Sequence, residues 1–176
     1  MAAPFKAALA LSRLIPRGRV LELCCGVGGL TRGLAAGHPV LAVDRDPSRL
    51  VQTAANLGGA GIEARVDLIC CDLTRPSLRP GGAWAACVLD PDWSPPGQPP
   101  RAWASSLEKM RPPAGTLARW ARGFSPRLAL RLPPETDLAP LAGLGPVQAW
   151  PMLKHGREAF CFALVGDWPE SEAVEL

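Results

Sequence analysis

The chain has 176 residues, of which 48% are hydrophobic, and its 19 Lys and Arg against 16 Asp and Glu give a net charge of +3. This length fits one domain with a well-buried core and leaves no room for a separate recognition domain. No stretch reaches the ~20 apolar residues of a membrane-spanning helix, so we expect no membrane partner and a cytoplasmic protein. The small positive charge permits an RNA or nucleotide partner without requiring one.

The cysteines are predicted to be small, buried, reduced side chains that bind no metal. None has C-x-x-C spacing, and they stand in apolar runs as Cys24, Cys25, Cys70, Cys71, Cys87 and Cys161. Neighbouring residues of a strand point to opposite faces, so an adjacent pair cannot bind one metal ion. We therefore predict neither a metal site nor disulfides, which fits a reducing cytosol.

Residues 1–17 are predicted to contain an N-terminal helix. Helical spacing places one set of side chains on a common face: Phe5, Ala8, Leu9, Ser12 and Ile15. Pro16 and Gly18 end the helix. Two roles are open for it, because it can pack against the core or cover the mouth of a cofactor site.

Residues 20–29, VLELCCGVGG, predict a buried parallel strand, a glycine-rich turn and the start of a helix. Gly26 and Gly28 let the backbone approach a ligand closely, and the helix amides point at that ligand. Glu22 is costly to bury, so we expect it near the strand end, serving the site. A plain connecting turn would leave Glu22 unexplained. A dinucleotide motif would have a third glycine where Thr31 stands, which favours another ligand.

The second strand, residues 40–43, ends at Asp44, which lies 18 residues after Gly26. In doubly wound folds, an acid at this place accepts hydrogen bonds from the ribose hydroxyls of an adenosine-containing ligand. The alternative is a surface acid in a turn. Because Asp46 already caps the following helix, we favour the ligand role for Asp44.

The third strand, residues 68–71, ends at Asp72. Glu22, Asp44 and Asp72 thus stand at or near the ends of three successive strands. In a parallel sheet these ends share one edge, where a single adenosyl ligand would span the three acids.

The fourth strand, residues 83–90, ends in Asp90-Pro91-Asp92-Trp93. This tetrapeptide resembles the [D/N]-P-P-[Y/F/W] motif of methyltransferases that modify exocyclic amino groups of bases, although Asp92 replaces a proline. The Asp90 carboxylate and the Pro91 carbonyl can accept the amine hydrogens while its lone pair turns to the methyl donor. Trp93 can stack on the flat base, or can simply fill a hydrophobic loop. We expect Asp92→Pro to preserve or raise activity.

Residues 94–103 are proline-rich and predict a stiff loop beside the site, in which Arg101 and Trp103 contact substrate or anchor the loop. The later elements are a helix at 114–123, a strand at 127–132, a short helix capped at Thr136 or Asp137, and a hairpin of strands 147–153 and 159–165.

These elements predict an α/β fold, a doubly wound Rossmann-like sheet with helices on both faces. The sheet has seven mostly parallel strands in the order 3-2-1-4-5-7-6, and the last strand is antiparallel. One domain covers residues 1–168, and 169–176 form an acidic tail. His38 and His155 are expected to be solvated.

The pattern E-x-x-x-G-x-G after the first strand resembles the first motif of class I S-adenosylmethionine-dependent methyltransferases. Three further segments, D-P-x-W, L-P-x-x-T-D-L and K-x-G-R-x-A-F-x-F-A-L-x-G-D, are similar to those of the RNA cap guanine-N2 (trimethylguanosine synthase) methyltransferases. The resemblance covers most of residues 18–168. It implies S-adenosylmethionine as cofactor and methyl transfer to the exocyclic N2 of guanine in RNA or a nucleotide. A capped RNA is not implied, because the basic N-terminal region of those enzymes is nearly absent.

The resemblance also implies roles for individual residues. Asp90 and Pro91 would hold the amino group and Trp93 would stack on the base, which makes them the predicted catalytic residues. Asp72 would hold the adenine amino group. The predicted cofactor-binding residues are Glu22, Cys24, Gly26, Gly28, Asp44, Arg45, Asp72, Leu73 and Asp90. Two alternatives are a methyltransferase of a small molecule or protein, and an S-adenosylmethionine-binding protein made inactive by Asp92.

Overall fold

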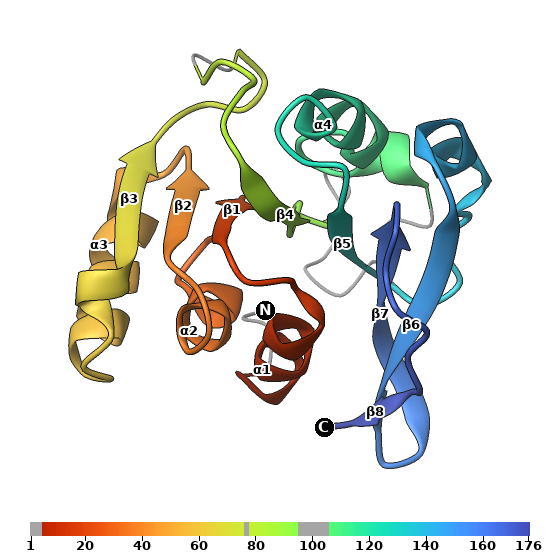
Figure 1. The fold of residues 1–176 in the computed structure, drawn as a ribbon, viewed down its shortest axis with the longest axis horizontal. Helices are drawn as coiled ribbons and strands as arrows, with labels where there is room; N and C mark the ends of the chain where they lie inside the picture. Colours follow the sequence, from red (N-terminus) through yellow and green to blue (C-terminus); the bar gives the residue numbers. More distant parts are fainter. Residues whose placement is uncertain (1–4, 76–77, 95–105) are drawn as a thin grey trace.

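A computed structural model of the chain describes residues 5–75, 78–94 and 106–176 (Figure 1). Its helices are α1 (Phe5–Leu14), α2 (Gly29–Ala35), α3 (Pro47–Gly58) and α4 (Ala114–Ala121), with the 3-10 helices η1 (Glu63–Arg65), η2 (Leu107–Lys109) and η3 (Ala139–Leu144). Its strands are β1 (Arg19–Leu23), β2 (Val40–Asp44), β3 (Val66–Cys70), β4 (Trp84–Leu89), β5 (Leu128–Leu132), β6 (Val147–Lys154), β7 (Arg157–Val165) and β8 (Val174–Glu175).

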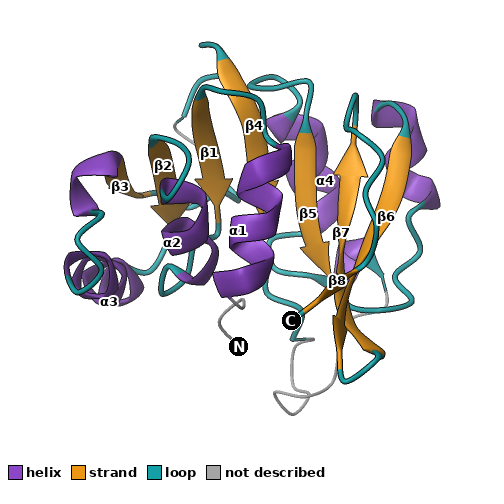
Figure 2. Ribbon diagram, turned by 60° about the horizontal axis from the view of Figure 1, so that its bottom comes forward, coloured by secondary structure: helices purple, strands orange, loops and turns teal. Residues whose placement is uncertain are grey.

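The strands form one sheet in the order β3-β2-β1-β4-β5-β7-β6-β8. Strands β1 to β5 are parallel to one another, and β7 is antiparallel to both β5 and β6. α1 and α2 cover one face of the sheet and α4 covers the other (Figures 1 and 2). The predicted doubly wound fold and its order of seven strands are confirmed, and β8 adds a short eighth strand.

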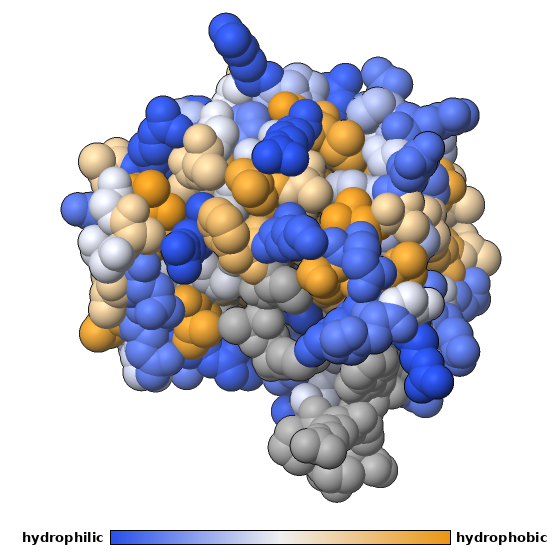
Figure 3. Space-filling view, turned by 90° about the horizontal axis from the view of Figure 1, so that it is seen from below, coloured by the Kyte–Doolittle hydropathy of each residue, from blue (hydrophilic) through white to orange (hydrophobic). Residues whose placement is uncertain are grey.

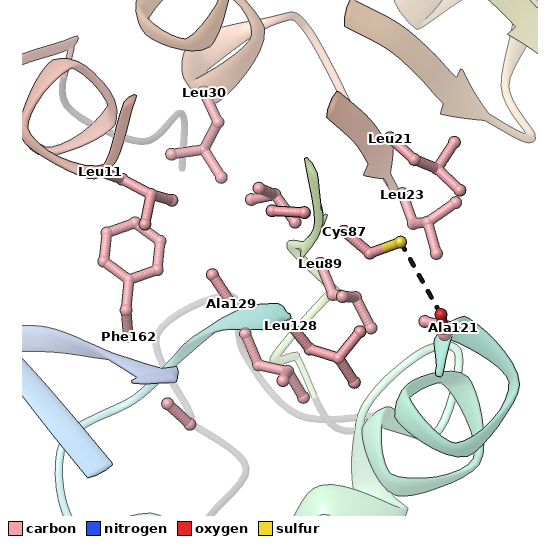
Figure 4. Packing of buried hydrophobic residues seen from close by; sticks show 14 of the residues in the cluster. Leu11, Leu21, Leu23, Leu30, Cys87, Leu89, Ala121, Leu128, Ala129 and Phe162 are labelled. Atoms are coloured by element: carbon pink, nitrogen blue, oxygen red, sulfur yellow. Dashed lines mark hydrogen bonds between the residues drawn. The ribbon is translucent and has the colours of Figure 1, made fainter. Parts of the chain in front are cut away.

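The core has two layers because side chains alternate along each strand. Leu21, Cys87 and Leu128 are in register on three neighbouring strands. They belong to the layer toward α4, where the Cys87 thiol lies 3.8 Å from the carbonyl oxygen of Ala121 (Figure 4). The intervening positions, among them Glu22, belong to the layer toward α1 and α2.

The N-terminal helix α1 packs against α2, and its buried face differs from the predicted one. Ala7, Ala8, Leu11 and Ser12 are buried, whereas Phe5 is 43% exposed. The predicted core position of Phe5 is wrong, because its ring instead lies against the Arg32 guanidinium, 4.8 Å from the ring centre. Small residues therefore form the contact between the two helices.

Two further expectations about single residues are wrong. His38, predicted to be solvated, is buried, with its ring nitrogens 3.1 Å from the Gly18 carbonyl oxygen and 2.9 Å from that of Ser12. Cys70, predicted to be buried, is exposed, because the sheet ends at β3 and leaves that side of the strand open. All the cysteines are free thiols.

The surface seen from below in the orientation of Figure 1 carries hydrophobic residues in small separate groups among hydrophilic ones (Figure 3). Of the large hydrophobic side chains in the described ranges, the exposed ones are Phe5 and Val51. No helix within these ranges is both long enough and apolar enough to cross a bilayer.

Candidate active site

A cavity of about 830 Å³ lies at the carboxyl-end edge of the sheet. Its walls come from the segments that follow β1, β2, β3 and β4, together with Arg111 and Pro112 and with Arg131 of β5. The strand order reverses between β1 and β4, and in open α/β sheets ligands bind at this position. The volume is in the range of small-molecule sites.

The two glycines of the first turn have different surroundings. Gly26 has φ +57°, lines the cavity, and a Cβ built on it would meet no atom within 4 Å. Gly28 has φ +83°, and a Cβ there would lie 2.8 Å from Cγ2 of Thr53 in α3. Gly26 thus leaves its space open to a ligand, whereas Gly28 allows the turn to pack on α3.

The Asp44 side chain is buried at the end of β2 and supports the turn. Its Oδ2 accepts a hydrogen bond from the Gly26 amide at 2.8 Å, and its Oδ1 accepts one from the Asp46 amide at 3.0 Å. The surface-acid alternative therefore does not hold. A carboxylate has about four acceptor positions, so Asp44, which also lines the cavity, can accept further bonds.

Asp72 is exposed and also lines the cavity. Its Oδ1 accepts hydrogen bonds from the amide and the hydroxyl of Thr74, at 2.9 and 2.8 Å. These bonds hold the pKa of Asp72 below its usual value. Leu73, which is buried, and Arg45, which is exposed, line the cavity near it.

Cys24 and Cys25 line the cavity as neutral thiols, because burial raises the pKa of both. Cys24 has φ 65°, a left-handed conformation that is uncommon for a residue with a side chain. Such strain is found at turns where the surrounding structure fixes the backbone. Within the described ranges, no group of three or more His, Cys, Asp or Glu is arranged to hold a metal ion.

Glu22 is the penultimate residue of β1 and is fully buried behind the cavity wall. Its pKa is raised to about 8, chiefly by burial and to a smaller extent by the nearby Asp90 and Asp44 carboxylates, while Thr31 partly lowers it. Neither carboxylate oxygen has a hydrogen bond of good geometry within the described part of the chain. Glu22 is therefore protonated at neutral pH, and it does not line the cavity.

Arg131 is a site residue that the sequence patterns did not indicate. Leu89 and Leu130 are in register, so the next residues, Asp90 and Arg131, lie side by side. Nη1 of Arg131 donates to both carboxylate oxygens of Asp90 at 2.9 Å. The available signal was a single charge in the apolar strand LALRL, which has to be paired if it is buried.

Burial and Arg131 act on Asp90 in opposite directions. The Asp90 side chain is 19% exposed and that of Arg131 is 4% exposed. Burial raises the pKa of Asp90 above its usual value, and the Arg131 charge and hydrogen bonds offset only part of this rise. The guanidinium contacts both oxygens, and this pairing favours the ionised form of Asp90.

Trp93 lines the cavity with a ring that is 9% exposed. Its indole N–H donates to the Arg131 carbonyl oxygen at 3.1 Å, and the Arg131 guanidinium lies 4.4 Å from the ring centre. Pro91 is buried beside it and also lines the cavity. The three residues of the D-P-x-W motif thus belong to one wall.

Asp92, where the methyltransferase motif has proline, uses the amide that a proline would lack. It forms a bridge with Arg111, in which each backbone N–H donates to the carbonyl of the other at 2.9 Å. Its side-chain Oδ1 accepts a hydrogen bond from the Ser94 amide at 3.0 Å. Residues 95–105, including Arg101 and Trp103, lie outside the described residues.

The sequence model of the RNA cap guanine-N2 methyltransferase family matches residues 17–148, which include the glycine turn, the acidic strand ends and the D-P-x-W motif. The chain belongs to this family. It is an S-adenosylmethionine-dependent methyltransferase.

Solved structures similar to this family member are methyltransferases. The glycopeptide N-methyltransferase MtfA with S-adenosylmethionine shares 17% identity and a TM-score of 0.65, over 94% of each chain. A predicted O-methyltransferase from Agrobacterium tumefaciens has 18% identity and a TM-score of 0.62, over 96% of this chain and 83% of that one. An rRNA methylase from Streptococcus thermophilus has 16% identity and a TM-score of 0.58, over 96% and 99%. At these identities the likeness concerns the fold.

Proposed function

We propose that this methyltransferase transfers a methyl group to the exocyclic N2 of guanine in RNA or in a guanine nucleotide. One observation carries the proposal. Asp90, Pro91 and Trp93, the residue types suited to a flat base with an amino group, line the same cavity as Gly26 and Asp44. An amine held there would lie beside the cofactor site.

The cofactor half of the cavity has the groups that an adenosyl ligand needs. When bound, S-adenosylmethionine supplies a methyl group on positively charged sulfur and leaves as S-adenosylhomocysteine. In our proposal, Asp44 accepts hydrogen bonds from the ribose hydroxyls and Asp72 from the adenine amino group. The open space at Gly26 gives room for close approach to the backbone.

In the acceptor half, Asp90 and the Pro91 carbonyl accept the two hydrogens of the guanine amino group. With its hydrogens held there, the nitrogen lone pair would be free to accept the methyl group that bound S-adenosylmethionine supplies. The nitrogen becomes positive and releases one proton to water. The Asp90 carboxylate favours this step because positive charge develops on the atom it contacts.

Exposed arginines at the cavity support an acceptor that carries phosphate. Arg45, Arg49 and Arg111 line the cavity and are exposed. Guanidinium groups bind phosphate oxygens through paired hydrogen bonds. We propose that the base contacts Trp93 on its cavity side while these arginines bind the phosphates.

The test is methyl transfer from labelled S-adenosylmethionine, after cofactor binding has been verified by calorimetry. Acceptors are total RNA, guanosine triphosphate, inosine triphosphate and a protein extract. Inosine is the matched control because its base is guanine without the exocyclic amino group. We expect transfer to RNA or to guanosine triphosphate and none to the inosine nucleotide.

Three other outcomes would overturn the proposal. Equal transfer to guanosine and inosine triphosphates would exclude N2 as the acceptor. Transfer to protein alone would move the substrate to another class. Cofactor binding without transfer to any acceptor would favour the inactive alternative.

A further inference from the structure

Arg131 is the charged residue of the otherwise apolar strand β5. It is buried between Asp90 and Trp93, the first and last residues of the D-P-x-W motif. Only 3% of its surface is exposed. Burying a guanidinium costs several kcal/mol unless its partners are well placed. The contacts that offset this cost therefore indicate the role of Arg131.

Those contacts fix the guanidinium on several sides. It packs against two aromatic rings, with its central carbon 4.4 Å from the Trp93 ring centre and 4.7 Å from the Phe160 ring centre. Its edge reaches Asp90, through the two 2.9 Å bonds from Nη1. Packing against two rings while bound to a carboxylate leaves the planar group little freedom to turn, so the direction of these bonds is set.

We propose that Arg131 is the positioning residue of the methyl-transfer site, holding the Asp90 carboxylate and the Trp93 ring in one arrangement and keeping Asp90 an acceptor of hydrogen bonds. This inference rests on the proposed function. Arg131 connects the two ends of D-P-x-W, because its side chain binds Asp90 while its carbonyl accepts from the Trp93 indole. One residue of β5 thus couples the amine contact to the base contact.

The surroundings of Asp90 make this cation necessary. Glu22 faces it from β1, Cys24 from the turn after β1, and Asp92 from its own loop, and Arg131 is the cation that faces it from β5. Burial raises the pKa of Asp90, so without Arg131 this carboxylate would take up a proton more readily. A protonated Asp90 would lose part of its capacity to accept the amine hydrogens.

The experiment compares Arg131→Met and Arg131→Lys with the parent. Methionine removes the charge but keeps a long apolar side chain, whereas lysine keeps the charge and loses the planar stack. The matched control is Arg127→Met, because Arg127 precedes the same strand and pairs with the exposed Asp167. Readouts are kcat and KM across pH, and the carboxyl 13C NMR titration of Asp90 in the cofactor-free protein, assigned with Asp90→Asn.

For Arg131→Met we expect kcat at neutral pH to fall at least about tenfold, with little change in the KM for S-adenosylmethionine. The midpoint of the Asp90 titration, and the acid limb of kcat, should move up by about 1 to 3 pH units, the usual effect of a neighbouring arginine. Arg131→Lys should keep the midpoint near that of the parent while kcat falls. Arg127→Met should change neither.

An unchanged Asp90 midpoint in folded Arg131→Met would overturn the proposal, as would an equal effect of Arg127→Met. If Arg131→Met does not fold, Arg131→Lys decides, and a parent-like kcat in that variant would count against a positioning role. The NMR titration needs no acceptor. If no guanine substrate is methylated, the proposed function fails and the role of Arg131 toward Asp90 is still measured.

Discussion

Glu22 shows how a single carboxyl group can be buried beside a site without lining its cavity. It is fully buried behind the glycine turn, and its pKa of about 8 keeps it protonated at neutral pH. A neutral carboxyl is far less costly to bury than a carboxylate. Its protonation therefore explains why this acid is tolerated on β1, a central strand between β2 and β4.

Glu22→Gln should change how stability depends on pH. The folded protein holds a proton on Glu22 up to about pH 8, whereas the ordinary pKa of a glutamate is 4.5. Between pH 4.5 and about pH 8, unfolding therefore releases this proton. The parent should lose roughly 1.4 kcal/mol of unfolding free energy per pH unit across that window as pH rises, and the glutamine variant should lose less. Urea unfolding at about pH 5, 6.5 and 8 measures this.

The control for this experiment is Glu63→Gln, because Glu63 is exposed in η1. It should follow the parent at each pH. If Glu22→Gln keeps the same dependence on pH as the parent, Glu22 is ionised in the folded state and its raised pKa is wrong.

Asp92 contributes to the stability of the turn mainly through its backbone N–H. Its N–H donates to the Arg111 carbonyl, which ties the D-P-x-W turn to the segment before α4. Proline at this position would remove the donor and leave that carbonyl without this bond. The structure thus changes the expectation from the motif, that Asp92→Pro would preserve or raise activity.

We predict that Asp92→Pro is less stable than Asp92→Ala by about 1 kcal/mol, the usual net contribution of one hydrogen bond. Alanine loses the contact with the Ser94 amide but keeps the backbone bridge. Chemical denaturation of the two variants gives the difference. If the proline variant is equally stable or more stable, the bridge does not hold the turn.

The contact between α1 and α2 depends on a helical glycine. A Cβ on Gly33 of α2 would lie 2.4 Å from the Ala8 Cβ and 2.8 Å from backbone atoms of Ala8 and Leu9 in α1. Backbone atoms cannot move aside as a flexible side chain can, so α1 would have to shift as a unit. Close helix packing thus holds the N-terminal element on the sheet.

Gly33→Ala should destabilise the protein by about 1 to 3 kcal/mol, the range for overpacking a core, although alanine favours helix. The control is Gly58→Ala in α3, where a Cβ would meet no atom within 4 Å. That variant should be stabilised by roughly 0.4 to 1 kcal/mol. Thermal and urea unfolding would show the opposite signs, and equal effects of both variants would contradict the packing account.

At the edge of the sheet opposite β3, the acidic C-terminal segment, residues 169–176, covers strand β6. β8 pairs with β6, the Trp150 indole N–H donates to the Glu172 carbonyl at 2.6 Å, and the His155 amide donates to Glu175 at 2.8 Å. An uncovered edge strand is a site for aggregation. The segment thus stabilises the hairpin at the opposite end of the sheet from β3.

Deletion of residues 171–176 should lower the unfolding free energy by roughly 1 to 3 kcal/mol, because Trp150 would keep a buried donor without its partner. The same deletion in a Trp150→Phe background should cost less, since phenylalanine has no N–H to satisfy. A double-mutant cycle from urea unfolding gives the coupling. Full additivity would mean that the indole bond contributes nothing.

The sequence alone was sufficient for the order of the first seven strands and for the family, whereas β8 was not predicted. These features depend on periodicity and on short segments, because a buried parallel strand followed by a glycine turn has one common arrangement. The positions of Asp44, Asp72 and Asp90 at strand ends followed from the same local rules. The roles of these residues in binding stay predictions, since they depend on ligands.

Only the tertiary structure decided which side chains meet. The partner of Asp90 is Arg131, 41 residues later, and His38 is buried between the carbonyls of Gly18 and Ser12, the latter 26 residues earlier. Phe5 is exposed because small residues filled the contact that periodicity had assigned to it. Local patterns specify which face of an element is apolar. Pairings between distant side chains depend on strand register and packing, which form only when the whole chain is folded.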